Sequence, residues 1–380
     1  MSTATPQLTL ADLRALAEGG AADLADSILL LASQPDPYLP SPPAGALTPQ
    51  LLNAKLREAY DNPRTEEARV QIALVWQKYL TQKEPPPAPR FLLADFLVWL
   101  HTRNDEPSRA TLIDLCARAP MRMGLWGGLK RIFKRAEQQL DAPLFGVLAA
   151  RFDFEAAGSS TGEVTRATLV YLKRRAWRYL RLLGRAVPEL YPQFAAAVLA
   201  QLPAGLDVSR SWVAAHILFH QSGSLDGTHF TVYGKLPADL VKDRAYDAAW
   251  KRSAGALMLL LETCLNDVVG RYAIAALRRD FPEVLRKVDA PWLDRVSRRA
   301  LPSVHDFVVE TLQGSVEFQA AKLKSLGLHE TVLALLGSPS QRARTYAIEY
   351  ARAHAQDLSA ERLVELAASP HADTRDFVAS

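Results

Sequence analysis

The chain has 380 residues, of which 45 are Lys or Arg and 41 are Asp or Glu, so its formal net charge is +4. Apolar residues make up 49% of it and charged residues 23%, a balance that is typical of a globular protein and excludes disorder as the main state. The only cysteines, Cys116 and Cys264, exclude a disulfide framework or a thiolate zinc cluster and fit a reducing compartment. We recognise no signal peptide and no apolar stretch near the ~20 residues that span a bilayer, and we therefore expect a cytoplasmic protein without membrane contact.

Apolar residues recur at spacings of three and four through most of the chain, and this period predicts helices. The expected helices lie at about 10–18, 21–33, 49–61, 64–82, 90–103, 107–118, 124–139, 142–151, 163–186, 189–201, 208–220 and 238–268 (one or two helices in the last range), with short helices after them. Proline-rich stretches at 34–49 and 84–89 separate helices, because proline interrupts regular structure. Longer loops are expected at 152–163 and 221–237, and the second contains the one plausible short strand, 228–234.

A repeat is visible near the end of the chain, where residues 333–351 align with residues 364–380 at an offset of 31. The aligned positions are Leu335 with Leu366, Ser338-Pro339 with Ser369-Pro370, Arg344 with Arg375, and Tyr346 with Phe377. Looser versions place Tyr272 and Phe307 at the aromatic position. The pattern describes a helix that ends in a Ser-Pro turn, followed by a second helix with an arginine in its first turns.

This pattern resembles HEAT-type repeats, with the closest match over 260–380. The family has a Val-Arg pair at the start of the second helix, and here Ala343-Arg344 and Thr374-Arg375 stand in that place. Residues 171–185 are also similar to a segment of long bacterial HEAT-like proteins. The resemblance implies an all-α fold, namely an α-solenoid of antiparallel helix pairs (a HEAT-like or armadillo-type superhelix) that serves as a binding surface.

We expect three parts along the chain: an irregular helical part at 1–150, a helical middle at 151–255 with a basic helix and the loop 221–237, and HEAT-like repeats at 256–380. Each repeat buries its apolar side only against its neighbours. Phe377 and Val378 lie close to the last residue, so we expect the array to continue beyond this chain or its end to contact a partner. A short frayed terminal helix is the alternative.

Two expected helices have one basic and one apolar side. In the helix at 163–186, a helical wheel places Leu172, Ala176, Leu180 and Leu183 on one side and the basic residues on the other. Its basic side consists of Arg166, Lys173, Arg174, Arg178, Arg181 and Arg185, with Trp177 among them and no acidic residue. The basic side of the helix at 124–139 consists of Lys130, Arg131, Lys134 and Arg135.

These basic sides predict binding to the phosphate backbone of DNA or RNA without sequence specificity, because clustered Lys and Arg release condensed counterions. An exposed Trp177 would stack on a base or on an arginine. The alternative is an ordinary solvated surface, or pairing with acidic residues of neighbouring helices. A third basic cluster, at 278–299, is diluted by Asp280, Glu283, Asp289 and Asp294.

We find no motif for catalysis, a cofactor, a metal or a small-molecule substrate, and we expect no enzyme. His216 and His220 are spaced like metal ligands, but HILFH lacks the Glu of a zinc hydrolase, so buried histidines are favoured even with His229 nearby. Some HEAT-like proteins are DNA glycosylases. In that reading the aromatic residues would be Trp177, Trp212 and Trp250, and the acid would be Asp207, Asp239 or Asp243.

The sequence thus predicts a non-enzymatic helical-repeat scaffold that binds nucleic-acid backbone through the helices at 124–139 and 163–186. A protein–protein adaptor that binds no nucleic acid is the alternative, and a glycosylase is a distant third.

Overall fold

The computed structural model describes residues 8–34, 54, 57–61, 65–81, 89–122, 124–155, 164–208, 211–222, 225, 236–355 and 358–379. Within these ranges the chain is helical and contains no β-strand element, so the all-α prediction is confirmed. The expected strand at 228–234 and nearly all of the loops at 34–49, 84–89 and 221–237 lie outside the described residues. No described helix is both long enough and apolar enough to cross a bilayer.

The chain divides into two compact units, one of residues 1–132 with 161–163 and one of residues 133–160 and 164–380, and the division falls within a helix. Described helices that begin in the first unit are α1 (Leu10–Glu18), α2 (Leu24–Ser33), α4 (Glu66–Thr81), α5 (Pro89–Arg103), α6 (Glu106–Arg118) and α7 (Leu125–Gln138), which ends in the second. The next helices are α8 (Ala142–Phe154), α9 (Arg166–Ala186), α10 (Tyr191–Ala200), α11 (Trp212–Phe219), α12 (Asp247–Trp250), α13 (Gly255–Thr263) and α14 (Asp267–Asp280). They are followed by α15 (Pro282–Leu285), α16 (Ala290–Ser297), α17 (Pro302–Gly314), α18 (His329–Ala334), α19 (Gln341–His354), α20 (Ala360–Ala367) and α21 (Ala372–Ala379), with 3₁₀ turns at Val316–Phe318, Ala320–Lys322 and Leu335–Gly337.

Short polar residues begin many of these helices, because a side-chain oxygen satisfies an amide that has no partner within the helix. Thr9 and Asp12 form a reciprocal capping box at α1. Thr165 caps α9 by accepting a hydrogen bond from the Thr168 amide at 3.2 Å, and Ser211 caps α11 in the same way. The helix starts therefore follow from local sequence.

In the first unit, α1, α2, α5 and α6 pack on one another. Leu13, Ile28 and Leu97 are fully buried among them. Gly128 of α7 lies so close to α5 that a Cβ atom there would stand 2.8 Å from Leu97 Cδ1. The glycine therefore permits the close helix approach.

An aromatic cluster forms the first part of the core of the second unit. Phe145 of α8 lies 5.4 Å from Phe133, 5.1 Å from Tyr179 and 5.4 Å from Phe194, measured between ring centroids, so that the cluster joins α7, α8, α9 and α10. Next to it α8 and α10 meet at Gly146, where a Cβ atom would stand 2.5 Å from the backbone carbonyl of Ala197. Only glycine allows this separation between the two helices.

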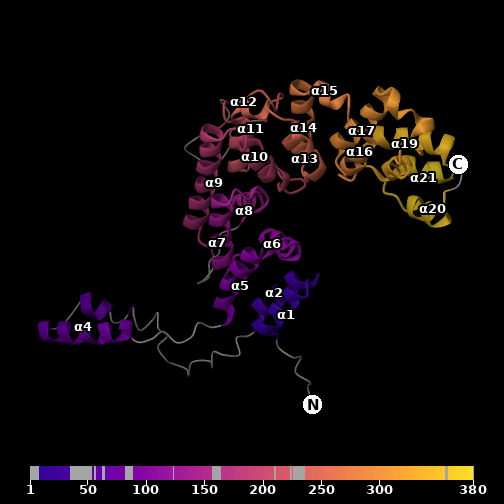
Figure 1. Cartoon of the computed structure of the whole chain (residues 1–380). Coiled ribbons are helices and arrows are strands. Elements are labelled where there is room, and N and C mark those ends of the chain that lie inside the picture. The colour runs from indigo at the N-terminus through magenta and orange to yellow at the C-terminus, as the bar shows by residue number, and fades with distance from the viewer. Residues whose placement is uncertain are drawn as a thin grey trace, which may run out of the picture. The chain divides into compact units, whose positions relative to one another are not determined.

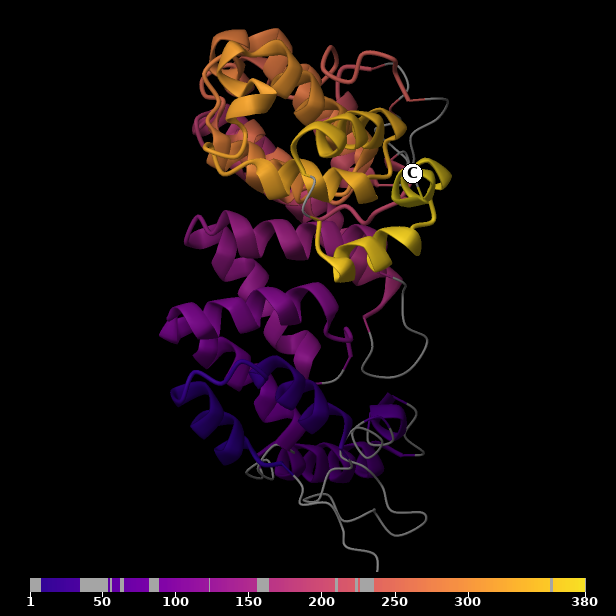
Figure 2. The ribbon, with the colours of Figure 1, turned by 90° about the vertical axis from the view of Figure 1, so that its right-hand side faces the viewer.

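Each later helix of the second unit packs on helices close to it in the chain. Helix α10 contacts α8 and α13, α13 contacts α14 and α16, α14 contacts α17, α17 contacts α19, and α19 contacts α21. Figure 1 shows these helices following one another in chain order, and Figure 2 shows them from the side. The core of this unit therefore extends from helix to helix.

Candidate nucleic-acid interface

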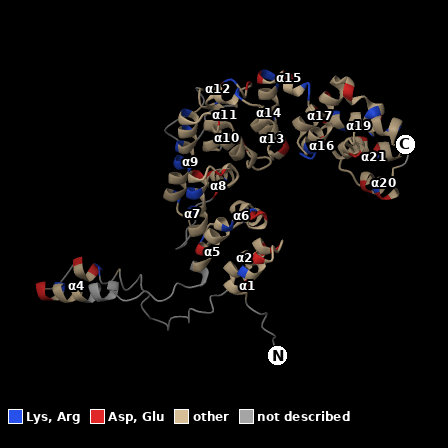
Figure 3. Ribbon diagram, in the orientation of Figure 1, with Lys and Arg blue, Asp and Glu red and all other residues tan. Residues whose placement is uncertain are grey.

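The longest described helix, α9, has the two chemically different sides that the wheel predicts. Leu172, Ala176 and Leu180 are fully buried, whereas Arg174 and Arg178 are exposed. Figure 3 shows Lys and Arg along α9 without Asp or Glu. The apolar side thus fixes which way the arginines point.

A groove of about 620 Å³ opens between α9 and α11. We call it the α9–α11 groove. Its α9 wall consists of Ala167, Val170, Tyr171, Arg174, Trp177, Arg178 and Arg181, and its α11 wall of Trp212, His216 and His220. The α9 residues recur at spacings of three and four and the α11 residues at spacings of four, so each set lies on one side of its helix.

The α9 wall contains a row of three arginines, Arg174, Arg178 and Arg181. Among the described residues no carboxylate is paired with Arg178 or Arg181. The Arg178 guanidinium lies 5.9 Å from the ring centroid of Tyr171, whose side chain is also exposed at the groove. Arg178 and Arg181 therefore place positive charge at the groove without an ion pair to a described carboxylate.

The α11 wall is aromatic and uncharged at neutral pH. His216 stacks on Trp177 with a centroid distance of 4.7 Å, and the edge of Trp212 meets it at 4.5 Å. Burial, together with His220 and Arg181, lowers the pKa of His216 to about 4, and burial and Arg181 also lower the pKa of His220. The two Nδ1 atoms lie 3.3 Å apart, so the N–H of one imidazole donates a hydrogen bond to the other.

Asp153, at the end of α8, fixes both walls of the groove. It accepts hydrogen bonds from Ser211 Oγ at 2.6 Å and from the Val213 amide at 2.7 Å, both at the start of α11. On its other side Lys173 of α9 donates to its backbone carbonyl at 3.0 Å and lies 3.5 Å from Oδ1. Burial raises the pKa of Asp153, while Lys173 and the hydrogen bonds oppose that shift. One buried carboxylate therefore fixes the position of α9 relative to the start of α11.

One expectation about the basic side of α9 is wrong: Trp177 is only 5% exposed, because α11 covers the ring that the wheel places among the cations. Lys173 of the same side contacts Asp153. Trp177 is therefore a buried part of the α9 wall, and Lys173 helps to position α9.

The remaining predicted cations have different surroundings. Arg166 and Arg185 are exposed near the two ends of α9. Lys134, near the end of α7, acts to lower the pKa of Glu137 and of Tyr171, and Arg178 does the same. Lys134 therefore adds positive charge near Tyr171, at the edge of the groove. Arg135 is half-buried.

In the first unit, Lys130 is half-buried and Arg131 donates to Asp95 of α5 at 2.6 Å. Arg131 thus follows the alternative that the sequence left open, in which a neighbouring helix supplies an acidic partner.

An ion pair that the sequence analysis missed lies beside Tyr171, to whose hydroxyl Arg175 donates at 3.3 Å. Arg175 donates from Nε to both carboxylate oxygens of Glu137 at 2.9 Å, and Tyr179 donates to the Glu137 carbonyl at 2.7 Å. Burial raises the pKa of Glu137, and Arg175 opposes that shift. Glu137 and Arg175 have opposite charges, but the sequence does not show that α7 and α9 are in contact. The ion pair could therefore not be predicted from the sequence.

The third basic cluster is paired with acidic residues. Each of Arg278, Arg279, Arg286, Arg295 and Arg298 forms an ion pair, with Glu310, Asp247 and Asp280, Glu283, Glu262 and Asp294 respectively. Three of the acidic residues that the sequence places among these arginines, Asp280, Glu283 and Asp294, thus contact them directly. The arginine row of α9 differs from this cluster in its surroundings.

Other residues weighed for chemistry lie apart from the groove. Trp250 is fully buried against Tyr191 and Tyr272, and Asp207, Asp239 and Asp243 do not line the groove. Cys116 and Cys264 are buried and unbridged. His229 lies outside the described residues, and no group of three or more His, Cys, Asp or Glu side chains within the described ranges is placed to hold a metal ion.

Comparison of the chain with family models, with curated proteins and with solved structures gives no match.

Proposed function

We propose that the chain is a non-enzymatic helical-repeat scaffold whose α9–α11 groove binds the phosphate backbone of a nucleic acid. The proposal depends on one observation: Arg174, Arg178 and Arg181 line an open groove from a helix that contains no acidic residue. Guanidinium groups match phosphate oxygens in geometry, and Arg178 and Arg181 form no ion pair with a described carboxylate.

The contrast with the rest of the second unit supports this assignment. At 278–299, where arginines are equally dense, Arg278, Arg279 and Arg295 form ion pairs with acidic residues of other helices. Arg178 and Arg181 form no such pair with a described carboxylate, which makes these two the better candidates for an anionic ligand.

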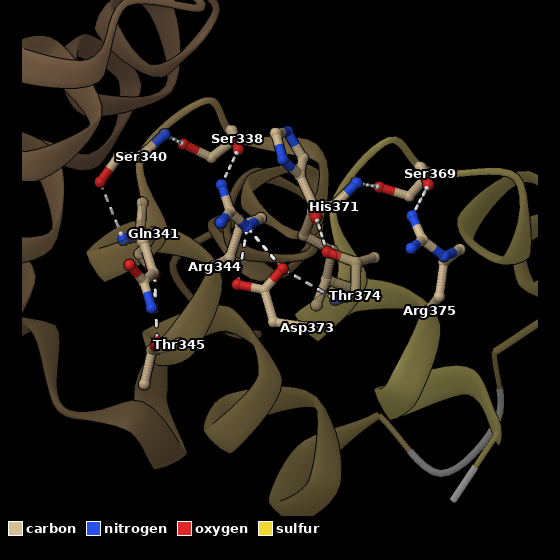
Figure 4. Close-up of polar contacts among 12 residues, drawn as sticks. Ser338, Ser340, Gln341, Arg344, Thr345, Ser369, His371, Asp373, Thr374 and Arg375 are labelled. Atoms are coloured by element: carbon tan, nitrogen blue, oxygen red, sulfur yellow. Dashed lines mark hydrogen bonds and ion pairs between the residues drawn. The ribbon is translucent and has the colours of Figure 1, made fainter.

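Equivalent contacts in successive repeats favour the scaffold part of the proposal (Figure 4). Arg344 donates to the Ser338 carbonyl at 2.8 Å, and Arg375, 31 residues later, donates to the Ser369 carbonyl at 2.7 Å. Each serine Oγ also accepts the amide hydrogen bond of the residue two positions on. The aligned Ser and Arg residues thus form the same turn twice, as expected of an α-solenoid.

Ion pairs between consecutive repeats point the same way. Arg295 reaches Glu262, Arg342 reaches Glu310, and Arg344 reaches Asp373, over sequence separations of 33, 32 and 29 residues. These separations are close to one repeat length.

The test is a charge reversal of the arginine row. We expect the triple variant Arg174→Glu, Arg178→Glu, Arg181→Glu to lose binding to a labelled oligonucleotide in fluorescence anisotropy while its circular dichroism stays unchanged. Binding by the parent should weaken with salt, with a slope of log K against log salt of roughly −2 for three phosphate contacts on a single strand.

The matched control reverses three exposed arginines of the same unit, Arg271, Arg286 and Arg298, to Glu. It changes the net charge equally but leaves the groove intact, and the exposed pairs that it breaks contribute little stability. Equal binding by the groove triple and the parent would contradict the proposal. A protein partner retained after nuclease treatment, without any binding of oligonucleotide, would favour the adaptor instead.

A further inference from the structure

The two walls of the α9–α11 groove differ in chemistry. Arg174, Arg178 and Arg181 span seven residues, which is about 10.5 Å along α9. Across from them lies an aromatic wall in which Trp212 and His216 are buried and His220 is half-buried. The groove is therefore cationic on one side and aromatic on the other.

We propose that this groove takes an unpaired nucleic-acid strand, with phosphates on the arginine row and bases toward His220 and Tyr171. The inference rests on the proposed function and narrows it to one class of nucleic acid. A single strand offers both phosphates and unpaired bases, and so matches an arginine row that lies between Tyr171 on the same helix and His220 across the groove. A duplex hides its bases and turns phosphates outward on both strands.

Two rings at the mouth of the groove are accessible to bases. Tyr171 is 42% exposed, and His220 is half-buried beside the more deeply buried His216. Tyr171 already has the Arg178 guanidinium near its ring, so a base stacked there would also contact a cation. Stacking of bases on aromatic rings tolerates any sequence, in keeping with the lack of a base-reading motif.

The inner rings fix these outer ones. Trp177 and Trp212 are almost fully buried around His216, and His216 holds His220 through the contact between their Nδ1 atoms. The aromatic wall is thus set before a ligand arrives, which lowers the ordering cost of binding.

The experiment compares three probes on the full chain: a labelled 12-nucleotide oligo(dT), a 12-base-pair duplex, and inorganic polyphosphate as a competitor without bases. We expect the single strand to bind at least tenfold more tightly than the duplex. In the Tyr171→Ala and His220→Ala variants, affinity for oligo(dT) should fall roughly tenfold per lost stacking contact. The inhibition constant of polyphosphate should be the same as for the parent, because polyphosphate has no bases to stack.

Leu182→Ala is the matched control, because Leu182 is 59% exposed on α9 and does not line the groove. The Leu182→Ala variant should bind all three probes with the affinities of the parent. Thermal unfolding verifies that every variant is folded. Absence of binding for all probes would contradict the proposed function itself. Equal affinity for strand and duplex, or an equal loss of oligo(dT) and polyphosphate binding in the two aromatic variants, would overturn this inference and leave backbone binding in place.

Discussion

His216 illustrates how a single residue acquires its properties from several helices. It is 4% exposed, with the ring of Trp177 from α9 on one side and His220 on its own helix next to it. The groups that face the two histidines are Arg174, Arg178 and Arg181 of α9. Asp153 and Lys173 lie at the start of α11, and Asp243 and Arg244 lie beside its end. Burial of His216 and the positive charge of Arg181 both oppose protonation of its imidazole.

This setting predicts a pH-dependent stability. An unfolded histidine has a pKa of about 6.5, whereas the pKa of His216 in the fold is lowered to about 4. The unfolded chain therefore binds more protons between these values, so the stabilisation is complete above pH 6.5 and is lost as the pH falls toward 4. The free energy of unfolding should decrease by roughly 3 kcal/mol over this window on account of His216.

Chemical denaturation at intervals from pH 7 to pH 4 measures this dependence. In His216→Gln the slope should be shallower by the contribution of one proton. An unchanged slope in His216→Gln would show that the titration belongs to other groups.

The residue scale also shows what the sequence could predict. The helical wheel correctly places Leu172, Ala176 and Leu180 inside and Arg174 and Arg178 outside, because the period of one helix decides this. It could not predict the burial of Trp177 or the pairing of Lys173. Those depend on α11 and α8, whose contacts with α9 are not encoded in its own spacing.

At the scale of helices, the groove depends on the polar junction of α8, α9 and α11. Asp153 is held by Ser211 and the Val213 amide from one helix and by Lys173 from another. A buried carboxylate that loses its cation keeps the cost of its desolvation. The sequence predicted these three helices but not the acid that joins them.

Lys173→Met tests this junction. It should lower the free energy of unfolding by about 3 kcal/mol, because Asp153 then stays buried without a counter-charge. The double variant Lys173→Met, Asp153→Asn should recover part of that loss, as a double-mutant cycle in urea would measure. If the double variant recovers none of the lost stability, the two side chains do not interact. If the salt dependence of oligonucleotide binding is the same in Lys173→Met as in the parent, Lys173 positions the helix and does not contact phosphate.

At the scale of the chain, the contacts of the second unit are local in sequence. Helices pack on near neighbours along the chain, and ion pairs join residues 29 to 33 positions apart in sequence. Stability in such an arrangement is a sum of neighbouring terms, so damage to one junction is felt mainly by the helices next to it. The alignment at an offset of 31 residues predicted the two similar Ser-Pro turns, whereas the pairing of Arg344 with Asp373 depends on how α19 meets α21.

Arg344→Met should therefore weaken the unit from one end. Arg344 is 8% exposed, and it binds both Asp373, at 2.8 and 2.9 Å, and the Ser338 carbonyl. Its loss removes the donor from the buried Ser338 carbonyl and the cation from the half-buried Asp373 carboxylate of α21. In hydrogen exchange followed by mass spectrometry, amides of α18 to α21 should exchange faster while those of α8 to α11 keep the rates of the parent. Arg342→Met, on the same helix but in a half-exposed pair with Glu310, should alter neither set. Faster exchange throughout the unit would instead indicate one cooperative body, which a stack of helix pairs joined only to their neighbours would not produce.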